Sequence, residues 1–320
     1  MIFFTNTLAY FCEIIANISY AYTMATKEFA IIGPTASGKT DLALNFAKKH
    51  DSIILSLDSL SVYKEIDIAS AKPTLEERGS IKHFGIDCIF VNDTFNVQIF
   101  INEYLKASNE AKRSGKSLII VGGTSFYLKS LLNGLSDVPI YSDKTTEKVN
   151  ELLENRADAH LFLNSIDKAH ASKIPPADSF RMQKALQIYF ETNLTPTQYF
   201  KENPPKPIIK NIEIFNITTE RDELRKRIFR RTEKMIELGI IDETADLEKK
   251  FGRLPNPMHS IGIKEVLGFL DGRYNKEKMQ ELIATHTVQL AKRQNTFNNG
   301  QFPNATSGSL EYLSTKQFTI

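Results

Sequence analysis

Cysteine, tryptophan and long apolar runs are scarce or absent in this chain of 320 residues. Its two cysteines, Cys12 and Cys88, stand alone, without a C-x-x-C spacing or a paired histidine. That pattern argues against a disulfide framework and against a zinc site. So few thiols fit a reducing compartment, and we expect a cytoplasmic protein. The chain also has no internal repeat and no low-complexity tract.

The first 23 residues are apolar and aromatic, but they match neither a signal peptide nor a membrane span. A basic n-region is missing, and Asn6, Glu13 and Asn17 interrupt the run. Met24 is a more natural start, just ahead of the first predicted strand. We therefore treat residues 1–23 as an extension of doubtful translation and expect no membrane association.

Composition and charge are those of an ordinary soluble enzyme, with 42% hydrophobic and 24% charged residues. The length allows one large domain, or a core with a smaller domain. The net charge of +2 says little, but the segment from Arg221 to Lys234 holds seven basic and three acidic residues. Such a segment suits a polyanion, or it is simply a solvated helix face.

A complete phosphate-binding loop is the most informative motif. It follows the apolar run of residues 29–32, precedes an amphipathic helix, and reads Gly33-Pro34-Thr35-Ala36-Ser37-Gly38-Lys39-Thr40. Glycines let successive N–H groups turn inward, and the helix N-terminus adds a positive dipole. The motif predicts binding of a di- or triphosphate, with Lys39 on phosphate oxygens and Thr40 as a ligand of Mg²⁺.

Short apolar strands alternate with helices along much of the chain. Strands are predicted at residues 52–57, 117–121 and 212–217, with helices at 97–113 and 126–132. This alternation predicts an α/β fold with a parallel sheet, whose ligands gather beyond the carboxyl ends of the strands. Residues 136–200 contain no convincing strand and predict a helical insertion, followed by a proline-rich linker over 201–207. The core then comprises residues 24–135 and 201–320.

Asp58 is the one acidic residue at the end of a predicted strand. The strand over 117–121 ends instead in Gly122-Gly123-Thr124, without the carboxylate that orders Mg²⁺ in most hydrolases and kinases with this loop. Asp58 is therefore a metal-ordering carboxylate, a base beside the phosphates, or a residue that caps a turn through its own backbone.

Six ordered motifs resemble those of the bacterial tRNA dimethylallyltransferases. Besides the phosphate loop, they are the strings D-S-L-S-V-Y-K-E-I-D-I-A-S-A-K-P (58–73), V-G-G-T (121–124), P-A-D-S-F-R-M-Q-K-A-L (176–186), H-S-I-G-I-K-E (259–265) and Q-L-A-K-R-Q-N-T-F (289–297). The resemblance covers about residues 26–297. It implies a P-loop NTPase-like sheet and transfer of a dimethylallyl group from its diphosphate to N6 of adenosine 37 of tRNA.

The resemblance also implies roles at the reacting centre. Lys39, the loop N–H groups, Thr40 with Mg²⁺ and Arg231 stabilise the departing diphosphate. Asp58 accepts the N6 proton, and Thr124 positions the flipped base or its phosphate. From the sequence alone, Arg231 could equally form a surface ion pair, and Thr124 could cap a helix.

The family's tRNA-contacting segments fall on four stretches and on two separate threonines. The expected partners are dimethylallyl diphosphate and the tRNA anticodon stem-loop, and we expect the protein to be a monomer. The predicted tRNA contacts are Asp58, Ser59, Leu60, Ser61, Thr124, Thr146, Phe180, Arg181, Met182, Gln183, Lys184, His259, Ser260, Ile261, Gly262, Ile263, Lys264, Lys292, Arg293 and Gln294.

The chain departs from the family pattern in three places. Ala69-Ser70 replace the usual Gly-Thr, Thr146 stands where a basic residue is expected, and Phe297 replaces a tryptophan. Three other functions stay open: prenyl transfer to a free adenine nucleotide, a P-loop kinase for a nucleoside or small molecule, and an RNA-binding protein without catalysis. The first lacks the insertion and C-terminal motifs, and the last leaves the phosphate loop without a use.

Overall fold

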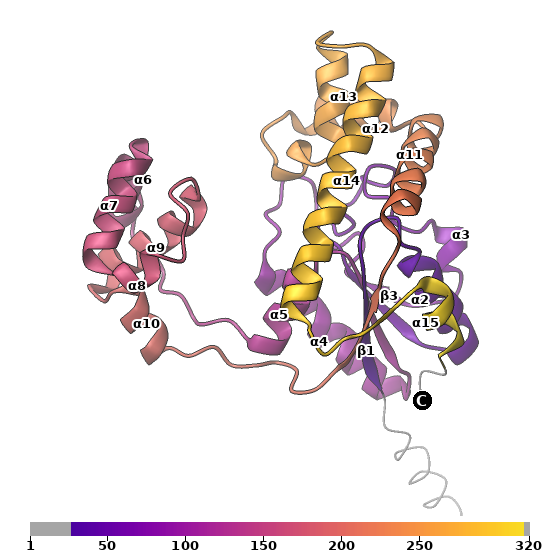
Figure 1. The fold of residues 1–320 in the computed structure, drawn as a ribbon, viewed down its shortest axis with the longest axis horizontal. Helices are drawn as coiled ribbons and strands as arrows, with labels where there is room; N and C mark the ends of the chain where they lie inside the picture. Colours follow the sequence, from indigo (N-terminus) through magenta and orange to yellow (C-terminus); the bar gives the residue numbers. More distant parts are fainter. Residues whose placement is uncertain (1–26, 317–320) are drawn as a thin grey trace, which may run out of the picture. The chain divides into compact units, whose positions relative to one another are not determined.

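The computed structural model describes residues 27–316, so the predicted extension over residues 1–23, with Cys12, lies outside the described residues. The chain divides into two compact units (Figure 1). One comprises the chain up to Lys129 and from Asn211 onward, and the other comprises residues 130–210. The insertion predicted over 136–200 lies inside the second unit, whose bounds are wider at both ends. The flanks include the end of α5 (Ser125–Asn133) and are joined by hydrogen bonds from the N–H groups of Ile208 and Ile209 to the carbonyl of Leu131.

A six-stranded parallel sheet forms the centre of the first unit, in the order β3-β2-β4-β1-β5-β6. Strands β1, β2 and β4 are buried on both faces, which explains their unbroken apolar runs. The predicted α/β fold with a parallel sheet is confirmed. The strands are β1 (Glu28–Ile32), β2 (Ile53–Leu57), β3 (His83–Phe84), β4 (Leu118–Gly122), β5 (Glu213–Ile217) and β6 (Thr306–Gly308).

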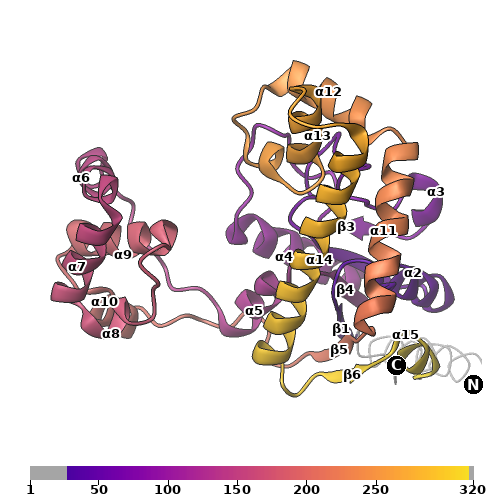
Figure 2. The same cartoon turned by 45° about the horizontal axis from the view of Figure 1, so that its top comes forward.

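Helices flank this sheet, and α11 and α14 pack against each other beside its carboxyl edge (Figure 2). Phe29 of β1 forms edge-to-face contacts with Phe46 of α2 and Phe215 of β5, which anchors the sheet to its first helix. The helices are α2 (Lys39–His50), α3 (Leu75–Arg78), α4 (Val97–Ser114), α5 (Ser125–Asn133, which runs into the second unit), α11 (Arg221–Glu237), α12 (Ile240–Phe251), η1 (Asn256–His259), α13 (Ile263–Leu270), α14 (Lys276–Gln301) and α15 (Leu310–Thr315).

The second unit is helical and has its own apolar core, which includes Val149, Leu163 and Leu186. The linker predicted over 201–207 begins too early, because α10 extends to Glu202. A capping box between Thr195 and Gln198 starts this helix, and the N–H of Asn203 donates to the carbonyl of Tyr199 at its end. The helices are α6 (Asp143–Glu154), α7 (Arg156–Ile166), α8 (Lys168–Ala171), α9 (Ser179–Thr192) and α10 (Pro196–Glu202).

Among residues 27–316, no helix combines the length and the apolar composition needed to cross a bilayer.

Candidate active site

The phosphate loop connects β1 to α2, as the sequence predicts. Gly38 has a φ of +88°, a left-handed conformation that favours glycine, and a Cβ there would also displace the end of the Leu310 side chain, 2.7 Å away. No side chain caps the start of α2. Its first N–H groups, together with the helix dipole, therefore face the loop and favour an anion.

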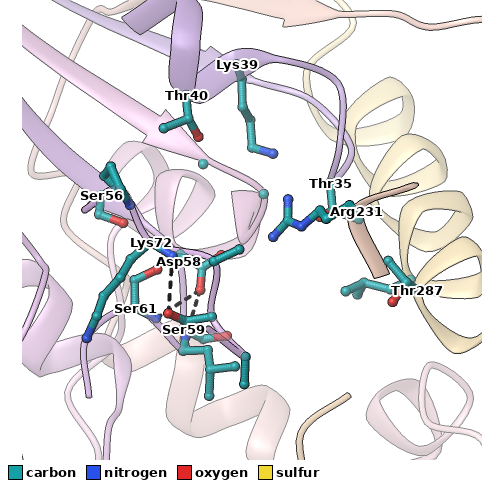
Figure 3. A pocket seen from close by; sticks show the side chains of 18 of the residues that line it. Thr35, Lys39, Thr40, Ser56, Asp58, Ser59, Ser61, Lys72, Arg231 and Thr287 are labelled. Atoms are coloured by element: carbon teal, nitrogen blue, oxygen red, sulfur yellow. Dashed lines mark hydrogen bonds between the residues drawn. The ribbon is translucent and has the colours of Figure 1, made fainter. Parts of the chain in front are cut away.

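Lys39 and Arg231 bring two cationic side chains to this loop (Figure 3). Lys39 Nζ donates a hydrogen bond of 3.0 Å to the carbonyl of Pro34. The pKa of Lys39 is lowered to about 8, chiefly by burial and also by repulsion from Arg231, while Asp58 acts in the opposite direction. Burial also lowers the pKa of Arg231, again opposed by Asp58. Burial and mutual repulsion disfavour the charged forms of these two side chains, and a bound anion would stabilise those charged forms.

Asp58 follows β2 and lies across the cavity from these cations (Figure 3). Its Oδ1 accepts hydrogen bonds from the N–H groups of Leu60 at 2.8 Å and Ser61 at 3.1 Å, so Asp58 does cap the turn that follows β2. Its Oδ2 makes no hydrogen bond with any residue that the structure describes. The turn thus fixes the carboxylate and leaves one oxygen for a ligand.

A cavity of about 220 Å³ connects these groups. Ser70, Ala71 and Lys72 form part of its wall, and α11 and α14 contribute Met235 and Thr287. Eleven of the predicted site residues line it: Thr35, Lys39, Thr40, Asp58, Ser59, Leu60, Ser61, Arg231, Ser260, Ile261 and Gln294.

Several predicted residues of the first unit lie outside the cavity wall. Thr124 donates its N–H to the carbonyl of Leu57, directly beyond cavity-lining Gly123. Ile263 is fully buried in an apolar cluster, so its side chain is a packing residue and its assignment as a tRNA contact is corrected. The exposed members of the same segments are His259, at the end of η1, and Lys264, Lys292 and Arg293, while Gly262 is buried just before α13.

The second unit carries the predicted contacts around α9, and one of them also needs correction. Met182 is fully buried in the core of this unit, because the helical period turns it inward, so its side chain is unavailable to RNA. Phe180 is 67% exposed. Arg181 forms a 2.6 Å ion pair with Asp178, and the three other predicted contacts, Gln183, Lys184 and Thr146, hydrogen-bond only to Asn150, Gln187 and Ser142.

Some residues that build the site were not assigned a role from the sequence. Lys72, quoted only as part of a motif, is buried and pairs with Asp67 at 2.6 Å and with Asp87, which fixes the wall over 69–73. Glu243 of α12 accepts the N–H groups of Asp67, Ile68 and Ala69 at 2.7 to 2.9 Å. The contacts of Glu243 have no local sequence signal, because they join segments about 175 positions apart, whereas Lys72 and Asp67 lie five positions apart in one motif.

The described residues contain no group of three or more His, Cys, Asp or Glu side chains that could hold a metal ion. A structural metal centre built from such side chains is therefore absent from residues 27–316. The hydroxyl of Thr40, which lines the cavity at the start of α2, remains as a side-chain oxygen beside the phosphate loop.

Comparison with known proteins identifies the family. The family described as IPP transferase matches residues 61–301. The tRNA dimethylallyltransferase of Sulfurimonas denitrificans is 54% identical over 89% of this chain and 96% of its own length. Two solved structures are similar to the fold. The tRNA isopentenylpyrophosphate transferase of Staphylococcus epidermidis has a TM-score of 0.63 at 31% identity, covering 89% of this chain and 94% of its own.

The second solved structure is a eukaryotic dimethylallyltransferase that acts on tRNA. Its TM-score is 0.78 at 26% identity, and the match covers 90% of this chain and 75% of that one. The sequence of this chain thus matches one family over most of its length. The same chain carries the phosphate loop, the carboxylate opposite it and the cavity between them. This chain belongs to the IPP transferase family.

Proposed function

We propose that this protein transfers a dimethylallyl group from dimethylallyl diphosphate to N6 of adenosine 37 in the anticodon loop of tRNA. One observation carries the proposal: two half-buried cations at a phosphate loop face a fixed carboxylate across a single cavity. In the reaction the bond between C1 of the prenyl group and the diphosphate oxygen breaks, and a bond between C1 and N6 forms. N6 loses one proton, and diphosphate leaves.

The diphosphate end of the donor occupies the phosphate loop. Negative charge accumulates on the leaving oxygen as the bond to C1 breaks, and Lys39 and Arg231 lie where they can stabilise it. Both side chains are held in a desolvated wall before the ligand arrives, so little reorganisation is needed during the reaction. Their mutual repulsion in the free protein is relieved when the anion binds.

Asp58 takes the proton from N6. The exocyclic amine is a weak nucleophile because its lone pair is delocalised into the ring, and attack on C1 makes its proton acidic. The hydrogen bonds from Leu60 and Ser61 occupy Oδ1, which directs the remaining oxygen toward the cavity. A positioned general base of this kind contributes roughly 10²–10⁴ in rate.

Mg²⁺ is the cofactor that fits this site. Mg²⁺ usually keeps several waters and takes one or two protein oxygens together with phosphate oxygens, so the lack of a carboxylate cluster among the described residues suits it. Thr40 would hold the ion through its hydroxyl. When bound, Mg²⁺ neutralises diphosphate charge.

Each unit offers exposed side chains for contacts with RNA. In the helical unit these are Phe180, Arg181 and Lys184, which offer a ring for stacking and charges for phosphates. In the α/β unit the basic members are Lys264, Lys292 and Arg293. The target base is unpaired in the loop, so its extrusion into the cavity costs a few kcal/mol at most.

One set of incubations tests the proposal against its alternatives. The protein with labelled dimethylallyl diphosphate and unmodified tRNA should yield labelled RNA whose label maps to adenosine 37 by nuclease digestion and mass spectrometry. AMP should remain unlabelled, and labelled ATP should transfer no phosphate to a nucleoside. Label in AMP would favour a nucleotide prenyltransferase, phosphate transfer would favour a kinase, and unlabelled tRNA would contradict the proposal.

A further inference from the structure

Gln294 of α14 lies between two loops that are far from it in sequence. Its Oε1 accepts the N–H of Thr35, inside the phosphate loop, at 2.8 Å. Its Nε2 donates to the carbonyl of Gly123, directly after β4, at 3.1 Å. One amide therefore bridges the phosphate loop and the turn that follows the neighbouring strand, and it does so from the wall of the cavity.

The bridge also explains why residue 123 is glycine. A Cβ at this position would lie 2.4 Å from Nε2 of Gln294, and the nearest atoms around it all belong to that side chain. The backbone at Gly123 has no left-handed φ, so an added Cβ would conflict only with the Gln294 amide, which would have to move. Gly123 and Gln294 thus form a matched pair, in which the missing side chain makes room for the amide.

The N–H of Thr35 is a donor that the phosphate loop would otherwise leave without a protein acceptor. With Gln294 in place, this N–H points to the amide, and the start of the loop is tied to α14. A phosphate loop binds well when its N–H groups are oriented before the ligand arrives. An amide fixed at both ends is suited to holding that orientation, because each of its hydrogen bonds restrains the other.

We propose that Gln294 is a positioning residue for the diphosphate site, and that it acts by holding the phosphate loop rather than by contacting RNA. The inference rests on the proposed function for the identity of the diphosphate donor. It changes the assignment of Gln294, which the family resemblance places among the tRNA contacts. The exposed Lys292 and Arg293 on the same helix remain candidates for RNA binding.

The direct test compares Gln294→Met with wild-type protein. Methionine fills similar space but neither accepts from Thr35 nor donates to Gly123. Loss of these hydrogen bonds should weaken binding of inorganic diphosphate, measured by calorimetry, roughly threefold to tenfold. KM for dimethylallyl diphosphate should rise by a similar factor, while the Kd of an anticodon stem-loop stays unchanged. Gln289→Met is the matched control, since Gln289 is exposed on the same helix, and it should bind diphosphate like the wild type.

A double-mutant cycle separates positioning from general damage to the fold. Gly123→Ala should displace the amide and reproduce the loss of diphosphate affinity. In a Gln294→Ala background the obstructing atoms are gone, so adding Gly123→Ala should cost little more. Thermal melts of all variants show whether they fold. Additive losses in the cycle would overturn the inference.

Two other outcomes are decisive. If Gln294→Met binds diphosphate like wild type but loses affinity for the stem-loop, Gln294 is an RNA contact and the inference is wrong. If wild-type protein binds diphosphate, loses that binding in Gln294→Met, and still transfers no prenyl group to tRNA, the inference holds and the proposed function fails.

Discussion

The two compact units place their polar side chains in opposite environments. In the α/β unit, Lys39, Arg231 and Asp58 line one cavity, where burial lowers the pKa values of both cations. In the helical unit, Arg181 and Lys184 are themselves exposed, and each pairs with a neighbour on the same helix or at its start, Asp178 and Gln187. The first arrangement suits a small anion whose charge changes during a reaction, and the second suits a long, hydrated polyanion.

This contrast has an energetic basis. A desolvated charge interacts strongly with its neighbours and is costly to leave unpaired, so each substitution in the cavity should have a large effect. An exposed charge is screened by water and salt and contributes modestly. Variants of the α/β unit should therefore change catalysis and diphosphate binding, and variants of the helical unit should change RNA affinity alone.

The largest effect is expected from Asp58→Asn. Asparagine keeps an oxygen that accepts from Leu60 and Ser61, so the turn survives, but the side chain no longer takes up a proton. Single-turnover transfer should fall by roughly 10²–10⁴. Diphosphate affinity, measured by calorimetry, should not weaken, because the substitution removes a negative charge from the cavity.

Asp58→Ala serves as the matched comparison. It removes the same base and also leaves two backbone N–H groups without their acceptor, so its unfolding free energy should drop by about 1–2 kcal/mol while that of Asp58→Asn stays close to wild type. Near-normal turnover by Asp58→Asn would exclude Asp58 as the base. It would also contradict the expectation that substitutions in the cavity of the α/β unit strongly affect catalysis.

The sequence predicts the α/β unit well where the signals are local. The apolar runs that became β1, β2, β4 and β5 and the glycine pattern of the phosphate loop each lie within a few residues, and the parallel-strand rule then brings Asp58 to the same edge as Lys39. Strands β3 and β6 have two and three residues, too short for any periodic pattern, and exist because longer neighbours pair with them.

Contacts between distant segments could not be predicted. The hydrogen bond between Gln294 and Thr35 joins residues 259 positions apart, and the one between Glu243 and Ile68 joins residues 175 positions apart. No sequence pattern links either pair. The helical unit shows a different failure. A motif assigns all its residues together, whereas the helical period divides them, so Met182 is buried and Arg181 beside it is exposed. Assigning roles along a helix requires the direction of each side chain.

A second, smaller effect concerns pH. The pKa of Lys39 is lowered from 10.5 to about 8 in the free protein, and a bound diphosphate favours the charged amine and raises that pKa again. Binding therefore takes up a proton above pH 8. Affinity for inorganic diphosphate should fall as pH rises, by up to about tenfold per pH unit beyond the pKa of the free protein.

Calorimetry in buffers of different ionisation enthalpy measures this proton uptake directly. Lys39→Arg is the control, because its guanidinium stays charged throughout the range and removes the lysine from the linkage. The pH dependence that remains in this variant belongs to diphosphate itself. Equal slopes for wild type and Lys39→Arg would show that the amine does not gain a proton on binding.

The smallest effect is expected in the helical unit, and it bears most directly on the comparison. Replacing Arg181 and Lys184 by alanine should lower stem-loop affinity roughly tenfold at moderate salt and reduce the slope of log K against log salt by about one to two. The control, Arg156→Ala with Lys168→Ala, removes equal charge from the same unit. Because these side chains are remote in sequence from the phosphate loop and belong to the other unit, the Kd of inorganic diphosphate should stay at the wild-type value in both double variants. A loss of diphosphate affinity, or an equal loss of stem-loop affinity in the control pair, would mean that the helical unit does not act as a separate RNA-binding surface.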